Sequence, residues 1–116
     1  MDVVFDPVGG ALTEAALRGI AWNGRHLVIG FASGDIPRVP LNLPLLKGCQ
    51  IVGVFWGDFT RREPAEAARQ LAILAGWARD GRIRPLVSAR FPLAQAHATL
   101  NAVAERRAVG KIVVLP

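Results

Sequence analysis

The sequence predicts an α/β fold built on a parallel sheet. Short apolar runs alternate with longer stretches whose apolar residues recur at helical spacing, which is typical of repeated strand–helix units. The length of 116 residues suits one domain with a substantial core. Hydrophobic residues make up 52% of the chain and charged residues 20%, so the composition excludes an intrinsically disordered protein.

The first 30 residues predict a strand, a helix and a second strand. Residues 3–5 form a short apolar run that stops before a proline, and residues 12–20 carry apolar side chains at helical spacing. Asn23-Gly24 is a turn signal, and residues 26–29 form the next apolar run.

The middle of the chain predicts a loop followed by a third strand. Residues 31–45 contain three prolines and a Ser-Gly-Asp sequence, which favour irregular structure. Residues 45–48 predict a short helical turn closed by glycine, and residues 50–55 predict the strand.

The clearest predicted helix begins at Pro64, since proline is well tolerated at the first helical position, and ends before Gly81. Its apolar stripe consists of Ala67, Leu71, Leu74 and Ala78. An extended segment is predicted at 85–91, a helix at about 93–106 and a terminal strand at 112–115.

Three strands and two helices resemble one half of a doubly wound sheet. The chain opens directly inside an apolar strand, although a parallel strand normally has neighbours on both edges and cover on both faces. We therefore expect this chain to be a truncated form of a longer protein.

Several classes of function are disfavoured by composition. The net charge is +5, but the arginines are scattered and are not interleaved with aromatic residues, which argues against nucleic-acid binding. A single cysteine, Cys49, excludes an internal disulfide and a four-cysteine zinc site, and His26 and His97 lack the spacing of helical zinc ligands. We expect no metal site.

The expected environment follows from what the sequence lacks. No apolar run approaches the roughly 18–20 residues that span a bilayer, and no secretory signal pattern begins the chain. The sequence therefore predicts a cytoplasmic protein without a membrane partner.

Five motifs in order carry a resemblance to a known family. Each is weak alone, but together they span nearly all of the chain. They lie at residues 4–10 (VFDPVGG), 24–34 (GRHLVIGFASG), 42–48 (NLPLLKG), 91–97 (FPLAQAH) and 109–114 (VGKIVV). In this order they resemble the carboxy-terminal part of zinc-free, NADPH-dependent quinone oxidoreductases of the medium-chain dehydrogenase/reductase superfamily.

The resemblance implies a fold and a division of the chain. Residues 1–83 would form the second half of a Rossmann-like nucleotide-binding domain. Residues 84–116 would form a carboxy-terminal strand–helix–strand segment that returns to the catalytic domain in the family.

The resemblance also implies cofactor-binding residues, because ligands of such folds lie at the carboxyl ends of the strands. Those near the nicotinamide half of NADPH would be Pro7, Val8, Ile29, Gly30, Phe31, Ala32, Val54, Phe55 and Trp56. Arg106 matches an arginine that reaches the bound nucleotide in the family.

Several of these residues can instead have a purely structural role. Gly9-Gly10 can be only a tight turn, Phe55 and Trp56 can serve a core or an oligomer contact, and Arg106 can complement a helix dipole. Asp6 is a plausible polar contact at a strand exit, but no basic partner is evident, and no catalytic residue is identified.

The implied activity is hydride transfer from NADPH to a quinone or enone, chemistry that the cofactor carries. These residues contain no G-x-G-x-x-G turn for the pyrophosphate, so the chain is expected to form only the nicotinamide-side wall. The sequence does not decide between NADPH and NADH, nor name the acceptor. The alternative is a non-catalytic interaction module or remnant that forms homo-oligomers through its sheet edges.

Overall fold

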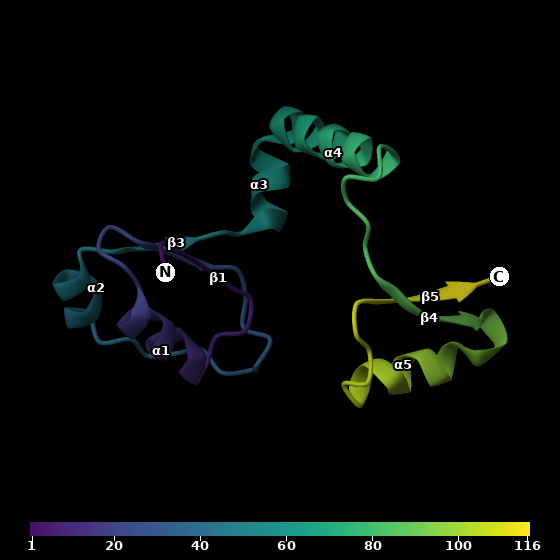
Figure 1. Ribbon diagram of the computed structural model, residues 1–116, viewed down its shortest axis with the longest axis horizontal. Helices are drawn as coiled ribbons and strands as arrows, with labels where there is room; N and C mark the ends of the chain where they lie inside the picture. Colours follow the sequence, from purple (N-terminus) through teal and green to yellow (C-terminus); the bar gives the residue numbers. More distant parts are fainter. The chain divides into compact units, whose positions relative to one another are not determined.

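The computed structural model describes all 116 residues. They divide into two compact units, Met1–Pro64 and Ala65–Pro116. Figure 1 shows the elements of both units in sequence colours. No helix is both long enough and apolar enough to cross a membrane.

The first unit is built on a three-stranded parallel sheet, as the sequence predicts. Its strands are β1 (Val3–Asp6), β2 (Arg25–Val28) and β3 (Gln50–Gly53), and their order in the sheet is β1-β2-β3. The register places Asp6 beside Val28, so the carboxyl ends of the strands meet at one edge of the sheet.

Three helices accompany this sheet. They are α1 (Ala11–Gly19), α2 (Asn42–Lys47) and α3 (Trp56–Arg62). Helices α1 and α2 each connect neighbouring parallel strands in sequence order, and crossovers of one hand place both on the same side of the sheet (Figure 1). Helix α2 is longer than the predicted turn at 45–48.

Helix α3 is not predicted from the sequence. It contains a glycine, it has no buried residue and it carries no apolar stripe that periodicity could reveal. Its side-chain contacts are local ion pairs, in which Asp58 binds Arg61 and Arg62 one turn later.

The two faces of the sheet differ in burial. On the helix-covered side, Leu17, Ile20 and Leu43 are buried. Strand alternation places Val3 and Phe5 on the opposite face, where the side chain of Phe5 remains 66% exposed. This unit therefore has one covered face and one open apolar face.

The second unit contains a two-stranded parallel sheet. Helix α4 (Pro64–Arg79) precedes β4 (Val87–Pro92), the 3₁₀ turn η1 (Leu93–Gln95), helix α5 (Ala96–Ala104) and β5 (Lys111–Leu115). Strands β4 and β5 pair in parallel, and α5 packs against both. These elements lie where the sequence predicts a helix, an extended segment, a helix and a strand.

Candidate functional site at the strand ends

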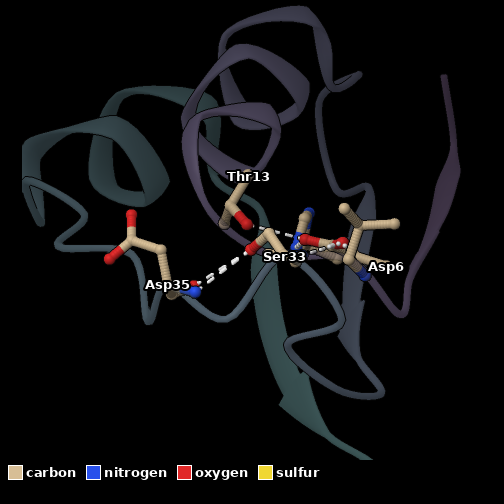
Figure 2. Close-up of polar contacts among 7 residues, drawn as sticks. Asp6, Thr13, Ser33 and Asp35 are labelled. Carbon is tan, nitrogen blue, oxygen red and sulfur yellow. Dashed lines mark hydrogen bonds and ion pairs between the residues drawn. The ribbon is translucent and has the colours of Figure 1, made fainter. Parts of the chain in front are cut away.

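Asp6 is the last residue of β1 and organises the loop that follows. Its Oδ1 accepts hydrogen bonds from the backbone N–H groups of Val8 at 3.0 Å and Gly9 at 2.9 Å. Its Oδ2 accepts the hydroxyl of Thr13 from α1 at 2.7 Å. Figure 2 shows Asp6 and Thr13 facing each other across the start of this helix. The carboxylate therefore ties the end of a strand to the next loop and helix.

His26 is a basic partner of Asp6 that the sequence pattern does not reveal. Its Nε2 lies 3.1 Å from Asp6 Oδ2, and the residue is 0% exposed. Because the ionised carboxylate can only accept, Nε2 carries the hydrogen of this contact. The Nδ1 atom is buried and has no hydrogen-bond partner.

Asp6 therefore has a basic partner that is not evident from the sequence. The two residues are 20 positions apart, and their contact depends on the register that pairs Val4 with His26. A polar residue at a buried position on each of two successive strands was the available signal, since buried polar groups normally pair with one another.

The surroundings of Asp6 stabilise its ionised form. Burial by itself raises the pKa of the carboxyl group. The hydrogen bonds from Gly9, Thr13 and Val8 and the nearby His26 outweigh this effect, and they lower the pKa of Asp6 from 3.8 to about 2. Asp6 is consequently an anion at neutral pH.

The loop after β1 requires glycine at its turn. Gly9 and Gly10 have φ angles of 72° and 62°, which side-chain-bearing residues rarely adopt. A Cβ atom on Gly9 would also lie 2.8 Å from the Phe31 ring. The Gly9-Gly10 pair is thus a tight turn, and at Gly9 it also permits close packing.

Backbone hydrogen bonds join this loop to the loop after β2. Amide N–H groups of the second loop donate to carbonyl oxygens of the first: Ile29 to Asp6 at 2.9 Å, Ala32 to Pro7 at 3.0 Å and Ser33 to Val8 at 3.0 Å. In the reverse direction, the N–H of Gly10 donates to the carbonyl of Asp35 at 3.2 Å. The two loops are therefore held as one rim.

A depression of about 460 Å³ lies at the ends of β2 and β3. This volume falls within the roughly 300–1,000 Å³ of small-molecule sites. It is lined by Val28, Ile29, Gly30, Phe31, Gly53, Val54 and Phe55. Five of the predicted cofactor-binding residues therefore come together: Ile29, Gly30, Phe31, Val54 and Phe55.

The other predicted residues lie elsewhere. Pro7, Val8 and Ala32 belong to the hydrogen-bonded rim and do not line the depression. Trp56 begins α3, where its ring centroid lies 5.3 Å from that of Phe59. It does not line the depression either.

Arg106 belongs to the second unit and follows the end of α5. It is exposed and has a φ of 56°, and its N–H donates to the carbonyl of Val103 at 3.0 Å. This geometry closes the helix end through the backbone of Arg106.

A smaller crevice lies beside the depression. It measures about 200 Å³ and is lined by Asp6, Thr13, Val28, Phe31, Ile36, Pro37, Val39 and Ile51. Val28 and Phe31 line both hollows. Nowhere in the chain do three or more His, Cys, Asp or Glu residues gather as a metal site would require.

Comparison with other proteins identifies relatives along the whole chain. Residues 1–114 match the family described as zinc-binding dehydrogenase. Quinone oxidoreductase-like protein 2 of Bos taurus is 35% identical over 114 residues, which cover 98% of this chain and 33% of that protein. Its homolog in Nematostella vectensis is 32% identical over 114 residues, covering 97% of this chain and 31% of the relative.

Solved structures are also similar to this chain along its whole length. The quinone oxidoreductase of Thermus thermophilus, also solved with NADPH, is 31% identical, with a TM-score of 0.79, and the match covers 100% of this chain and 37% of that one. A mycobacterial protein complexed with NADPH is 28% identical, with a TM-score of 0.82, covering 100% of this chain and 35% of the other. The chain thus spans about a third of the length of these relatives.

These matches confirm the predicted Rossmann-like α/β class and the predicted resemblance. The family match over residues 1–114, supported by the quinone oxidoreductase-like relatives, shows that this chain belongs to the zinc-binding dehydrogenase family.

Proposed function

We propose that the strand-end depression binds the nicotinamide half of NADPH, in a protein that transfers hydride to a quinone or enone. The observation that carries this proposal is the depression itself, which lies at the carboxyl ends of β2 and β3. Ligands of open parallel sheets bind at this edge. Relatives that have been solved with NADPH support the choice of cofactor.

The residues of the depression fit a flat heterocycle. A Cβ on Gly53 would meet no atom within 4 Å, so this glycine leaves open space beside the strand end. The side chains of Ile29, Val54 and Phe55 offer apolar surface around it. Such walls would hold the ring in one orientation and limit the access of water.

No side chain that lines the depression is titratable. When bound, NADPH would itself supply the hydride, so the protein needs only to bind and orient it. The carboxylate of Asp6 already accepts hydrogen bonds from Val8, Gly9, Thr13 and His26. We therefore assign Asp6 no part in proton transfer.

The remaining predicted contacts are part of the proposal. Pro7, Val8 and Ala32 would border the nicotinamide ribose from the rim, and Trp56 would approach from the start of α3. Arg106 would reach the nucleotide with its guanidinium, as residues 84–116 return to the substrate domain of a longer protein. The proposed location is the cytoplasm, which fractionation of the source cells would test.

The test is an NMR titration of the ¹⁵N-labelled chain with NADPH. Weak affinity, with a millimolar dissociation constant, is expected because the chain contains no G-x-G-x-x-G turn. Chemical-shift changes should centre on Gly30, Phe31 and Val54. NADH should give the same shifts, because residues selecting the 2′-phosphate are not expected in this chain.

A matched pair of variants sharpens the test. Gly53→Leu adds a side chain at a position that lines the depression, where its Cβ would meet no atom within 4 Å, and it should abolish the shifts. Gly76→Leu makes the same chemical change in α4 and should leave them intact. Shifts centred elsewhere, or binding that survives Gly53→Leu, would contradict the proposal.

A second candidate is a non-catalytic module that self-associates. It is favoured by the open face that carries Phe5 and by the edge position of β1 and β3 in the sheet. Apolar faces and free strand edges of this kind commonly pair with another chain. Light scattering at high concentration should then give at least a dimer, and a strict monomer would exclude this candidate.

A further inference from the structure

We propose that Asp6 is a positioning residue for the depression, and that His26 and Thr13 fix the orientation of its carboxylate. The inference rests on the proposed nicotinamide site, because it explains how the wall of that site is held in place. None of the three residues lines the depression.

Asp6 acts on both loops of the rim. Its carboxylate holds the N–H groups of Val8 and Gly9 in the first loop. Its backbone carbonyl accepts from Ile29 at 2.9 Å and from Gly30 at 3.4 Å, and both of these residues line the depression. Asp6 is therefore hydrogen-bonded both to the first loop and to two residues that line the depression.

The first loop is in turn hydrogen-bonded to the second loop. The carbonyls of Pro7 and Val8 accept the N–H groups of Ala32 and Ser33, each at 3.0 Å. These carbonyls point correctly only while the turn through Gly9 keeps its shape, and the Asp6 carboxylate holds that turn. Protection of the Ala32 and Ser33 amides from exchange thus reports on the carboxylate.

The orientation of the carboxylate depends on its other oxygen. Terminal carboxylate rotations are broad and nearly two-fold, so donors on one oxygen alone restrain the group weakly. Oδ2 receives the Thr13 hydroxyl from α1 and Nε2–H of His26 from β2. Helix α1 and strand β2 therefore both restrain the orientation of the Asp6 carboxylate.

His26 allows positioning to be separated from general stability. Its Nδ1 is buried without a partner. His26→Leu removes this unsatisfied acceptor together with the donor to Asp6, so the two effects on folding oppose each other. The fold should persist while the carboxylate loses one of its restraints.

The experiment measures amide hydrogen exchange in the full chain without ligand, in His26→Leu, Thr13→Val and Asp6→Asn. Exchange at Ala32 and Ser33 should accelerate by about tenfold, the equivalent of one hydrogen bond to a charged group. Amides within β2 and β3 should keep their protection in His26→Leu, whose two effects on folding oppose each other. Thr99→Val, which removes a buried hydroxyl that has no partner, should change none of these rates.

A second readout addresses the site. NADPH titration of the same variants should give a dissociation constant about three- to tenfold weaker, as expected when a preorganised loop loses one restraint. If His26→Leu keeps full protection at Ala32 and Ser33, or loses protection uniformly across β1–β3, the positioning role is overturned. If the unaltered chain gives no shifts in the depression, the proposed function fails, while exchange still decides the positioning role.

Discussion

Phe31 lies so close to Gly9 that a Cβ atom on the glycine would be 2.8 Å from the aromatic Cδ1. The same phenylalanine lines both the depression at the strand ends and the crevice beside Asp6. A side chain at position 9 would therefore conflict with this ring, which borders both hollows.

Gly9→Ala should destabilise the first unit by about 2 kcal/mol. Part of the effect is the left-handed conformation at φ 72°, which costs a side-chain-bearing residue roughly 1–2 kcal/mol, and part is the contact with Phe31. Urea denaturation followed by resolved amide signals of this unit measures the change. Gly76→Ala in α4 is the control, and it should stabilise its helix by about 0.5–1 kcal/mol. Equal effects at the two glycines would contradict this explanation.

Acidic pH should lower the free energy of unfolding, because the Asp6 carboxylate becomes protonated. Its pKa is lowered from 3.8 to about 2, so the stabilisation is fully present above about pH 4 and is lost as the pH falls through about 2. A shift of this size corresponds to about 2 kcal/mol. Asp6→Asn should lose this part of the pH dependence in urea denaturation across that window.

Glu66 provides the control for this prediction. Hydrogen bonds from Arg69 and Gln70 lower its pKa to about 2 as well, but the pair lies on the surface of α4. Exposed ion pairs contribute little to stability, because solvent and salt screen them. Glu66→Gln should therefore leave the acid stability almost unchanged, and a loss equal to that of Asp6→Asn would argue against the buried network.

Two buried threonines allow a matched comparison. Thr13 donates its hydroxyl to Asp6 at 2.7 Å, whereas the hydroxyl of Thr99 has no partner, and both lie in helices. Thr13→Val should cost about 2 kcal/mol, because it removes a hydrogen bond to a charged group. Thr99→Val should be neutral or stabilising. Urea denaturation monitored separately for each unit gives both values.

The sequence predicted the regular elements well where periodicity is strong. Helix α4 was found from its proline start, its apolar stripe and its closing glycine, and these signals are local. Helix α3 is not predicted because it buries no residue and so shows no apolar stripe, while its contacts are ion pairs between Asp58 and its arginines. Local charge pairs leave only a weak trace in a hydrophobic pattern.

The candidate site can be predicted from the sequence only in part. Residues of successive strand ends, such as Ile29 and Val54, come together because parallel strands share an edge, and topology alone places them. The contact between Asp6 and His26 depends on strand register, which the sequence does not state. Trp56 is the first residue of α3, a helix that the sequence does not predict, and it does not line the depression.

The open face of the first unit leads to a prediction about association. Phe5 is 66% exposed on this face, and Leu12 is 62% exposed on α1, so the two apolar side chains are comparably accessible. If the face pairs with a second copy, Phe5→Lys should shift the chain toward monomer in light scattering, because a buried ammonium without a partner is costly. Leu12→Lys should leave the association unchanged. If both variants dissociate the chain equally, the contact is non-specific, and the face that carries Phe5 is not the interface.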